Sequence, residues 1–361
     1  MERLNVDLGK HSYDIVFEKD FLSLPAGLAE IGAPEKLLLV TDSNVAPIYG
    51  EEVKRLLCEA GYDVGIHIFP AGEQHKDMEQ ILGICGACLK HHMDRNSMVL
   101  ALGGGVVGDM AGFAAAIYMR GIRFVQIPTT LLSQSDSSVG GKTGIDFGGG
   151  KNLLGAFPQP KLVYINVAAL KTLPQREFIS GMGEVIKHGM IADHTFFDQL
   201  QREAGKIKAL DPEVLIAIAK KNCSIKAQVV MQDERELGVR ANLNFGHTIG
   251  HGIEAACNFT QTHGQCVAFG MLAAARIACQ RGIFKEEELH ALKKILSAYG
   301  FEMGISLPAV EDILQTMQKD KKKLNGKLKF ILPVKTGQVI QTTDVTEEEI
   351  RDAVVFIGGT V

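Results

Sequence analysis

The sequence predicts an α/β domain built on a parallel sheet, followed by a mainly α-helical domain. Over residues 1–170, short β-branched runs alternate with amphipathic stretches, which is typical of a parallel sheet with helices packed on its faces. After about residue 173, apolar residues recur almost only at helical spacing. The segment 170–175 between the two patterns is short and contains a proline. We therefore expect two domains, 1–173 and 174–361.

The elements of the first domain follow in order along the chain. Strands are favoured where β-branched and other apolar residues run together between glycine-rich or polar flanks. Helices are favoured where apolar residues recur every three or four positions. The expected strands are 36–42, 63–69, 97–105, 123–130 and 161–166, with helices at about 46–60, 77–92 and 106–119.

The second domain is expected to be helical, with one weak strand signal at 328–334. Helical periodicity runs through GMGEVIKHGMI, PEVLIAIAKKNCSIKAQVV, FGHTIGHGIEAAC and GQCVAFGMLAAARIACQRG.

Composition narrows the classes of function. With 361 residues, 46% of them hydrophobic, and a net charge of −4, the chain resembles a globular protein without a surface for nucleic acid or anionic membranes. The N-terminal residues include acidic side chains and no apolar run, so no signal peptide is expected, and no segment is apolar over the length that a membrane span needs. The seven cysteines are an odd number, which favours reduced thiols, and Cys85 and Cys88 are expected to be core thiols within a helix. We expect a cytoplasmic protein that acts on small molecules.

A glycine turn at 100–113, LALGGGVVGDMAGF, contains Gly103, Gly105 and Gly108 between a strand and a helix. Such glycines let backbone N–H groups approach a pyrophosphate at the start of a helix, which favours dinucleotide binding. The usual acid about twenty residues later is absent, but Asp42 ends an earlier strand and could bond a ribose. Alternatively, the glycines only allow the strand and helix to pack closely.

The segment 128–157 is rich in hydroxyls and glycines, and its cations are Lys142 and Lys151. Flanking strands and the apolar residues Leu131, Leu132 and Phe157 distinguish it from a linker. We expect a loop that binds a phosphorylated ligand or the phosphates of a cofactor.

The stretch LNFGHTIGH (243–251) places His247 and His251 one helical turn apart, on one face. These histidines could be metal ligands or satisfied core groups. A catalytic zinc site usually takes three protein ligands. Spacing alone does not choose among the candidates Glu184, His188, His247, His251 and His263.

Seven motifs together resemble the 3-dehydroquinate synthases, over about residues 41–329. Their order and spacing agree with that family. They are GEQHK (72–76), LALGGGVVGD (100–109), YMRGIRFVQIPTTLLSQSDSSVGGKTGID (118–146), GKNLLGAF (150–157), GEVIKHG (183–189), LNFGHTIGH (243–251) and HG (263–264).

The resemblance implies a dehydroquinate synthase-like fold, with a Rossmann-like NAD-binding domain at 1–173 and a metal- and substrate-binding domain at 174–361. It implies conversion of 3-deoxy-D-arabino-heptulosonate 7-phosphate to 3-dehydroquinate and phosphate, the second step of the shikimate pathway. The implied steps are alcohol oxidation, phosphate elimination, ketone reduction, ring opening and aldol cyclisation. The implied cofactors are NAD and one divalent metal, zinc or cobalt.

The resemblance also assigns residues. Metal ligands would be Glu184, His247 and His263, so that His251 would face the substrate. Near the substrate phosphate it places Lys142, Asn152, Asn244 and His251, and near the carboxylate Lys226 and Arg240. Lys187 and His251 are candidate proton carriers, Asp136 joins the catalytic set, and Lys321 is the choice within the DKK segment. NAD would lie on Asp42, Glu73, Lys76, Gly105, Val106, Asp109, Thr129, Thr130, Lys142, Lys151 and Thr172.

Arg120 is similar to an arginine that the family delivers to the phosphate from a neighbouring subunit, which implies a homodimer. Two positions depart from the family pattern: Gln265 stands where a Glu is usual, and Gly183 where Ala is frequent. A glutamine cannot carry the charge of a Glu near the metal, so metal affinity or the pH optimum could differ. The alternative functions are another sugar-phosphate cyclase and a metal-dependent polyol dehydrogenase.

Overall fold

The computed structural model of the chain describes residues 2–148, 150–323 and 328–360, with backbone only for 319–323. The chain forms two compact units. The first contains Met1–Leu173 and Leu215–Met231, and the second contains Pro174–Val214 and Gln232–Val361. We expected one boundary, after residue 173. In the structure, residues 215–231 also belong to the first unit. Each unit is described separately below.

The first unit contains a seven-stranded sheet in the order β1-β2-β9-β6-β5-β3-β4. All neighbours are parallel except β1 and β2. The strands are β1 (Glu2–Val6), β2 (Tyr13–Glu18), β3 (Lys36–Asp42), β4 (Asp63–Phe69), β5 (Met98–Gly103), β6 (Arg123–Pro128) and β9 (Leu162–Asn166). The five strands expected from the sequence are present, and the β1–β2 hairpin was not expected.

Helices cover both faces of this sheet. Alternate strand residues point to opposite faces, so Leu38 and Val40 pack with α3 (Met78–Lys90) and α4 (Gly105–Ile117). Leu37 and Leu39 pack instead with α1 (Leu24–Glu30) and α2 (Glu51–Glu59). Because both faces of the sheet are covered, the central strands β3, β5 and β9 are mainly continuous apolar runs without polar alternation.

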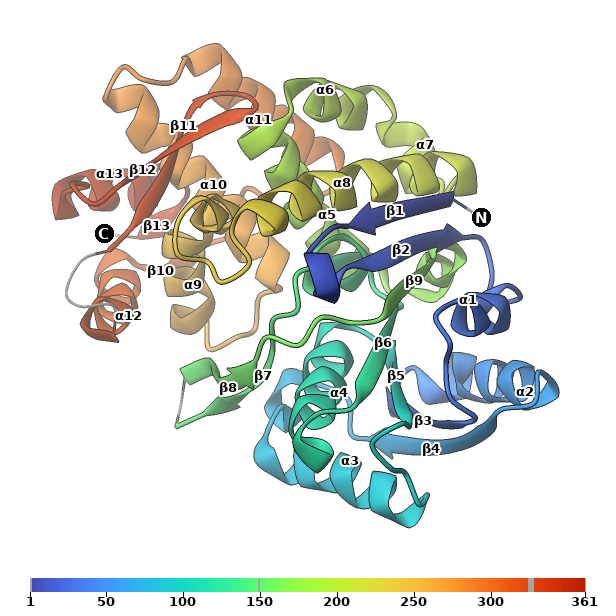
Figure 1. Cartoon of the computed structure of the whole chain (residues 1–361). Coiled ribbons are helices and arrows are strands. Elements are labelled where there is room, and N and C mark those ends of the chain that lie inside the picture. Colours follow the sequence, from blue (N-terminus) through green and yellow to red (C-terminus); the bar gives the residue numbers. More distant parts are fainter. Residues whose placement is uncertain (1, 149, 324–327, 361) are drawn as a thin grey trace. The chain divides into compact units, whose positions relative to one another are not determined.

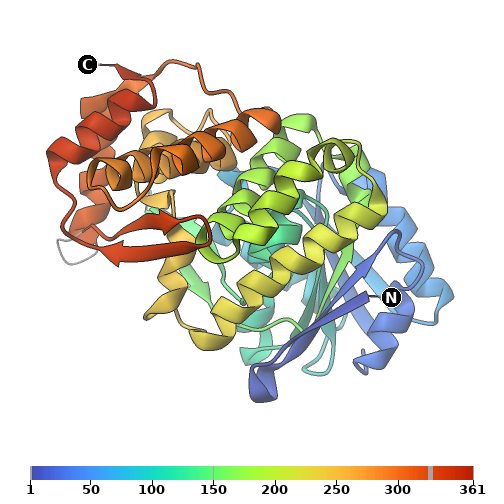
Figure 2. The same ribbon diagram turned by 90° about the horizontal axis from the view of Figure 1, so that it is seen from above.

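Helix α8 (Pro212–Gln232) lies beside the β1–β2 hairpin (Figures 1 and 2). Lys220 Nζ is 2.8 Å from Glu2 Oε2, and the Asp7 amide lies 3.3 Å from Met231 Sδ. Asn222 Nδ2 donates to the Ser135 carbonyl at 2.7 Å. The segment expected to be one binding loop contains an antiparallel hairpin, β7 (Thr143–Phe147) and β8 (Gly150–Ala156), against α4.

The second unit is mainly helical, as expected from its periodicity. Helix α10 is buried along most of its length and contacts α5, α9, α11 and α13. The α-helices of the second unit are α5 (Gln175–Ala192), α6 (His194–Arg202), α7 (Ala204–Lys208), α9 (His247–Ala256), α10 (His263–Gln280), α11 (Glu286–Ala298), α12 (Val310–Lys323) and α13 (Glu347–Phe356). Two small sheets pair β11 (Phe330–Lys335) with β12 (Gln338–Thr342) and β10 (Leu307–Ala309) with β13 (Gly359–Thr360).

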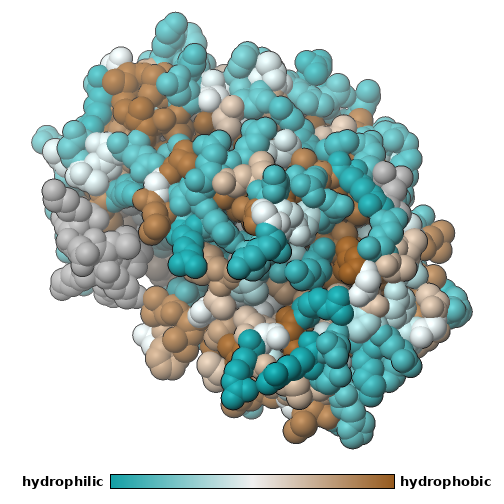
Figure 3. Space-filling model, viewed as in Figure 1, coloured by the Kyte–Doolittle hydropathy of each residue, from teal (hydrophilic) through white to brown (hydrophobic). Residues whose placement is uncertain are grey.

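Among the described residues, no helix has both the length and the apolar character required to cross a membrane. On the face drawn in Figure 3, apolar side chains lie in separate groups between polar ones.

Candidate active site

The first unit has a topological switch point between β3 and β5. The chain passes from β3 to β4 on one side and later returns to place β5 on the other side of β3. In open parallel sheets, ligands bind at the carboxyl ends of such strands. Asp42 is the last residue of β3, and α4 begins at Gly105, two residues after β5 ends. Two of the expected NAD contacts therefore lie at the switch point.

The glycine turn also has a packing function. A Cβ at Gly103 would lie 2.5 Å from Val107 Cγ2, and one at Gly108 would lie 2.6 Å from Gln126 Oε1. The start of α4 nevertheless provides amide groups without intrahelical partners, and the helix dipole favours an anion there. The two interpretations of these glycines are therefore compatible.

Other expected nucleotide contacts lie on the same edge. Asp42 Oδ1 accepts from the amides of Asn44 and Val45, at 2.9 Å each. The amide of Thr129, directly after β6, donates to the Gly103 carbonyl at 2.9 Å. The hydroxyl of Thr172 is 2.6 Å from that of Tyr49. The half-buried residues Val106 and Thr130 occupy the α4 and β6 ends of this edge.

A buried cation connects the expected cofactor and substrate residues of this unit. Lys76 Nζ is 2.6 Å from Asp109 Oδ2 and 2.6 Å from Asn152 Oδ1. Lys151 Nζ lies 3.8 Å from Glu73 Oε1. Burial lowers the pKa of Lys76, but the carboxylates of Asp109 and Glu73 outweigh it, so that the net pKa is raised. Lys76 therefore remains charged.

The expected catalytic residues of the first unit lie in three places. Lys226 Nζ, on α8, is 2.6 Å from Asp136 Oδ1. Lys142 is exposed just before β7. Arg120 is exposed after α4, where its φ of 68° is in the left-handed region.

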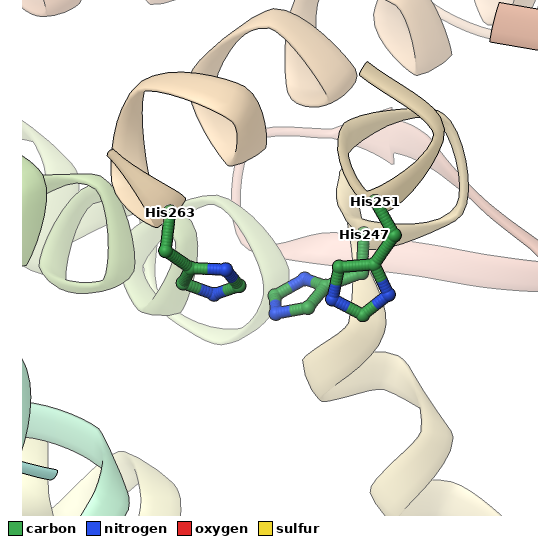
Figure 4. Close-up of side chains that lie close together, drawn as sticks. All are labelled: His247, His251 and His263. Carbon is green, nitrogen blue, oxygen red and sulfur yellow. The ribbon is translucent and has the colours of Figure 1, made fainter. Parts of the chain in front are cut away.

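In the second unit, three donor groups from three helices converge. Glu184 on α5 is fully buried, and His247 and His263 are the first residues of α9 and α10. Glu184 Oε1 is 3.6 Å from His247 Nε2 and 3.5 Å from His263 Nε2. The exposed His251 projects beside His247, with ring centroids 5.2 Å apart (Figure 4). Nitrogens of the three histidines lie within 4.8 Å of one another.

Glycines allow these helices to approach. A Cβ at Gly264 would lie 1.9 Å from the Ser180 carbonyl oxygen, and one at Gly270 would lie 1.8 Å from that of Gly246. Gly246, with φ 80°, turns the chain into α9 directly before His247. The Thr262 side chain caps α10 by accepting from the Gln265 amide. Helix starts and helix crossings together place the two histidines beside Glu184.

The donor set fits a divalent metal ion. Two ligands held about 2.1 Å from a tetrahedral ion are about 3.4 Å apart, close to the observed separations. His247 Nδ1 is 3.2 Å from the Phe245 carbonyl, and His263 Nδ1 is 3.5 Å from Glu254 Oε2, so both Nε2 atoms are directed at Glu184. Glu184 Oε1 is buried and has no hydrogen-bond partner among the described residues. This oxygen is therefore available as a ligand.

Burial and neighbouring charges shift the pKa values of these residues, and for Glu184 and His263 they act in opposite directions. Burial alone would raise the pKa of Glu184, but Lys187 and the two histidines hold it well below its usual value. Lys187 Nζ donates a hydrogen bond to Glu184 Oε2. Burial and Lys187 lower the pKa of His247, whereas for His263 the carboxylates of Glu184 and Glu254 outweigh burial and raise the pKa to about 9. His188 is also buried on α5.

The segment that follows α8 ends in a short 3-10 helix, Val239–Asn244, which carries two further expected residues. The side chain of Arg240 is buried and its Nη1 donates to the Glu234 carbonyl. Asn244 Nδ2 donates to Glu236 Oε1 at 2.9 Å. The side chain of Lys321 lies outside the described residues.

Sequence reasoning missed Glu254 and did not identify the partner of Gln265. Glu254 lies two helical turns after His247, a spacing that could have indicated a carboxylate beside the histidines. Gln265 was expected near the metal. Its side-chain amide pairs with the backbone of Glu302, with Nε2 3.1 Å from the carbonyl oxygen and Oε1 3.2 Å from the amide nitrogen.

Sequence similarity to known proteins extends over almost the whole chain. The family of 3-dehydroquinate synthase N-terminal domains matches residues 66–180, and that of the C-terminal domains matches 181–323. A 3-dehydroquinate synthase from Ruminiclostridium cellulolyticum is 48% identical over 97% of this chain and 98% of its own. One from Acetivibrio thermocellus is 46% identical over 99% of this chain and 100% of its own.

Solved structures show the same fold. The 2-epi-5-epi-valiolone synthase of Streptomyces hygroscopicus, with NAD+ and Zn2+ bound, has a TM-score of 0.87 at 28% identity and covers 96% of each chain. A 2-deoxy-scyllo-inosose synthase complexed with carbaglucose-6-phosphate, NAD+ and Co2+ has a TM-score of 0.88 at 24% identity, covering 99% of this chain and 100% of its own. These findings confirm the resemblance drawn from the motifs, and the chain belongs to the 3-dehydroquinate synthase family.

Proposed function

We propose that this protein converts 3-deoxy-D-arabino-heptulosonate 7-phosphate to 3-dehydroquinate and phosphate, as a cytoplasmic enzyme of the shikimate pathway. The observation that carries the proposal is the convergence of Glu184, His247 and His263, in a chain 46–48% identical over nearly its full length to proteins of that name.

We propose NAD and one divalent ion, zinc or cobalt, as cofactors. Bound together, they supply a hydride acceptor that returns its hydride and a positive charge that acidifies a hydroxyl. Related structures contain NAD+ with Zn2+ or Co2+. Glu184, His247 and His263 would hold the ion. NAD would bind at the switch point, on Asp42, Glu73, Lys76, Gly105, Val106, Asp109, Thr129, Thr130, Lys142, Lys151 and Thr172.

Lys187 and His251 are proposed to carry protons. Lys187 is hydrogen-bonded to Glu184, a proposed metal ligand, and as a neutral amine it would accept the proton that the substrate hydroxyl loses during alcohol oxidation. His251 is exposed beside His247 and could bond the substrate through a ring nitrogen.

Substrate anions require cations. The planar fork of Arg240 suits a carboxylate, with Lys226 as its proposed partner. Lys142, Asn152, Asn244 and His251 are proposed for the phosphate. Asp136 would orient Lys226, which it contacts at 2.6 Å. Lys321 remains a proposal for the phosphate, and Arg120 is proposed to reach the site of a second subunit in a homodimer.

A different sugar-phosphate cyclase is the second candidate, because the valiolone synthase shares the fold at a TM-score of 0.87. Its sequence identity is 28%, against 48% for the 3-dehydroquinate synthase from Ruminiclostridium cellulolyticum. A polyol dehydrogenase is a weaker alternative, since a probable glycerol dehydrogenase from Sinorhizobium meliloti is 16% identical with a TM-score of 0.60.

One assay separates these functions. The purified protein is given the heptulosonate phosphate, a catalytic amount of NAD, and zinc or cobalt, and phosphate release is followed together with absorbance of NADH. Many phosphates released per NAD, without accumulation of NADH, are expected for the proposed cyclase. NADH rising in step with substrate loss would identify a dehydrogenase. Absence of turnover would exclude this substrate and favour another sugar phosphate.

A further inference from the structure

Residues 233–244, called the 233–244 loop here, form a turn followed by the short 3-10 helix Val239–Asn244, and one carboxylate organises their backbone. Asp233 Oδ1 accepts from the amide of Leu237 at 2.9 Å. Asp233 Oδ2 accepts from the amides of Gly238 and Arg240, at 2.7 and 3.0 Å. Both oxygens of a single side chain therefore hold three amides, and a charged acceptor makes such bonds stronger than a neutral one would.

Arg240 is attached to this loop at both of its ends. Its backbone amide donates to the Asp233 side chain, and its guanidinium Nη1 donates to the carbonyl of Glu234. The arginine side chain is only 1% exposed. The two consecutive residues 233 and 234 therefore define where the Arg240 backbone lies and the direction in which its fork extends.

Strand β12 also contacts the 233–244 loop, at residues other than Arg240. Gln341, on β12, donates from Nε2 to the Gly238 carbonyl at 3.0 Å and to Asn242 Oδ1 at 2.9 Å. These contacts hold the middle of the loop without touching Arg240. Asp233 is thus the side chain that connects the braced loop to the backbone of Arg240.

We infer that Asp233 is a positioning residue that presets Arg240 for the substrate carboxylate. The inference rests on the proposed function, in which Arg240 binds that carboxylate. A free arginine side chain carries about 2 kcal/mol of rotamer entropy, and loop ordering adds to the cost of binding. With Asp233 in place, the loop and the arginine side chain are already ordered in the free enzyme, so this entropy is not lost on substrate binding. Substrate binding is tighter for that reason.

The test is a double-mutant cycle on the holoenzyme. Asp233→Asn keeps the size of the side chain but places an NH2 group against backbone N–H donors. We expect Asp233→Asn to raise KM about tenfold and to change kcat by less than about threefold, because the loop must then be ordered during binding. In the Arg240→Ala background, the same change should alter KM by less than about twofold, since Asp233 acts through Arg240.

Asp211→Asn is the matched control. Asp211 Oδ1 also accepts two backbone amides, from Glu213 at 3.0 Å and Val214 at 3.2 Å, and none of these residues is placed at the site. Its KM should stay at the wild-type value. Melting temperature, NAD content and metal content are measured for every variant. Where Asp233→Asn does not fold, Asp233→Ser, which keeps one acceptor oxygen, is expected to show the same coupling with Arg240→Ala.

The possible outcomes test the role of Asp233 separately from the proposed function. An unchanged KM in Asp233→Asn, or an equal KM increase with and without Arg240, would overturn this inference alone. No turnover by the wild-type holoenzyme would overturn the proposed function, and the inference with it.

Discussion

At position 265 the side-chain amide uses both of its polar atoms in hydrogen bonds with one residue, Glu302. Nε2 donates to the Glu302 carbonyl and Oε1 accepts from the Glu302 amide. The residue is 7% exposed. A carboxylate could replace the second bond but not the first. Gln265 is therefore suited to hold the first turn of α10, which begins with His263.

We expect Gln265→Glu to lower the free energy of unfolding by about 1–3 kcal/mol, because a buried carboxylate would face a carbonyl oxygen. Urea unfolding of the metal-free protein measures this change. Gln280→Glu, on the exposed end of α10, is the control and should change it by less than about 0.5 kcal/mol. Equal unfolding midpoints for the two variants would show that the pairing with Glu302 does not stabilise the protein.

Individual residues were predictable to different degrees. Motif order brought out Glu184, His247 and His263, which the structure places together, while their roles stay proposals. Asp233 could not be singled out, because its importance depends on the path of the backbone from 233 to 240. Gln265 was visible as a departure, but its partner Glu302 lies after another helix and no sequence spacing connects them.

Between elements, the closest approach occurs where α10 meets α5. A Cβ at Gly264 would lie 1.9 Å from the Ser180 carbonyl oxygen, and one at Gly183 would lie 2.9 Å from the Gly264 carbonyl oxygen. These helices carry His263 and Glu184. Backbone contact at this crossing therefore sets the separation of two proposed metal ligands.

We expect Gly264→Ala to destabilise the protein by about 3 kcal/mol and to lower its retained zinc, because α10 must move away from α5. Denaturant unfolding and metal content after gel filtration measure the two effects. Gly205→Ala, on α7, is the matched control, since a Cβ there meets no atom within 4 Å. Full zinc retention in Gly264→Ala would contradict the role assigned to the crossing.

An ion pair joins the end of α10 to α13. Arg281 Nε and Nη2 lie 2.6 and 2.8 Å from the two oxygens of Glu349, and the pairing with Arg281 lowers the pKa of Glu349 to about 2 against the opposing effect of burial. A carboxyl with a lower pKa in the folded state stabilises the fold above its unfolded pKa, about 4.5. That contribution is lost as pH falls towards 2.

Arg281→Met should therefore lower the melting temperature most above about pH 5, and the difference from wild type should shrink as pH falls from 4.5 towards 2. Thermal unfolding across this range is the measurement. Arg55→Met, at the exposed pair with Glu59, should have a small effect at every pH. A melting difference for Arg281→Met that does not vary with pH would rule out the ion pair as its cause.

Among the elements, buried parallel strands were the most predictable, because continuous apolar runs between turns leave few alternatives. The β7–β8 hairpin was not predictable from alternation. Gly144 and Gly155 face each other across it, and a Cβ at Gly155 would lie 2.1 Å from the Thr143 carbonyl oxygen. Close backbone approach, rather than side-chain pattern, defines this hairpin. The sequence therefore indicated only a glycine-rich binding segment.

For the whole molecule, the proposed homodimer makes a testable demand on Arg120, which is exposed at the end of α4. Arg120→Ala and Glu184→Gln should each be nearly inactive alone. Mixing the two by unfolding and refolding should restore about a quarter of wild-type activity, since half of random dimers are hybrids with one complete site. The measurement is phosphate release after mixing, with each variant refolded alone as the control. No recovery would place Arg120 in its own subunit's site.

At this scale, the sequence indicated two kinds of architecture and the order in which they occur. It did not indicate that 215–231 belongs with the first unit, because the helical periodicity of α8 resembles that of the helices around it. The contacts that decide its place are specific, such as the bond from Asn222 to the Ser135 carbonyl.

The return of α8 to the first unit also affects when that unit can finish folding during synthesis. The amino-terminal part of a chain usually folds first as it leaves the ribosome. Here the first unit is complete only when Met231 has been made, after Pro174–Val214, which belongs to the other unit. Until then, the nascent sheet domain lacks the helix that carries Asn222, Cys223 and Lys226 against residues 134–136. Translation speed between residues 174 and 231 therefore determines how long this incomplete domain is exposed to chaperones and proteases.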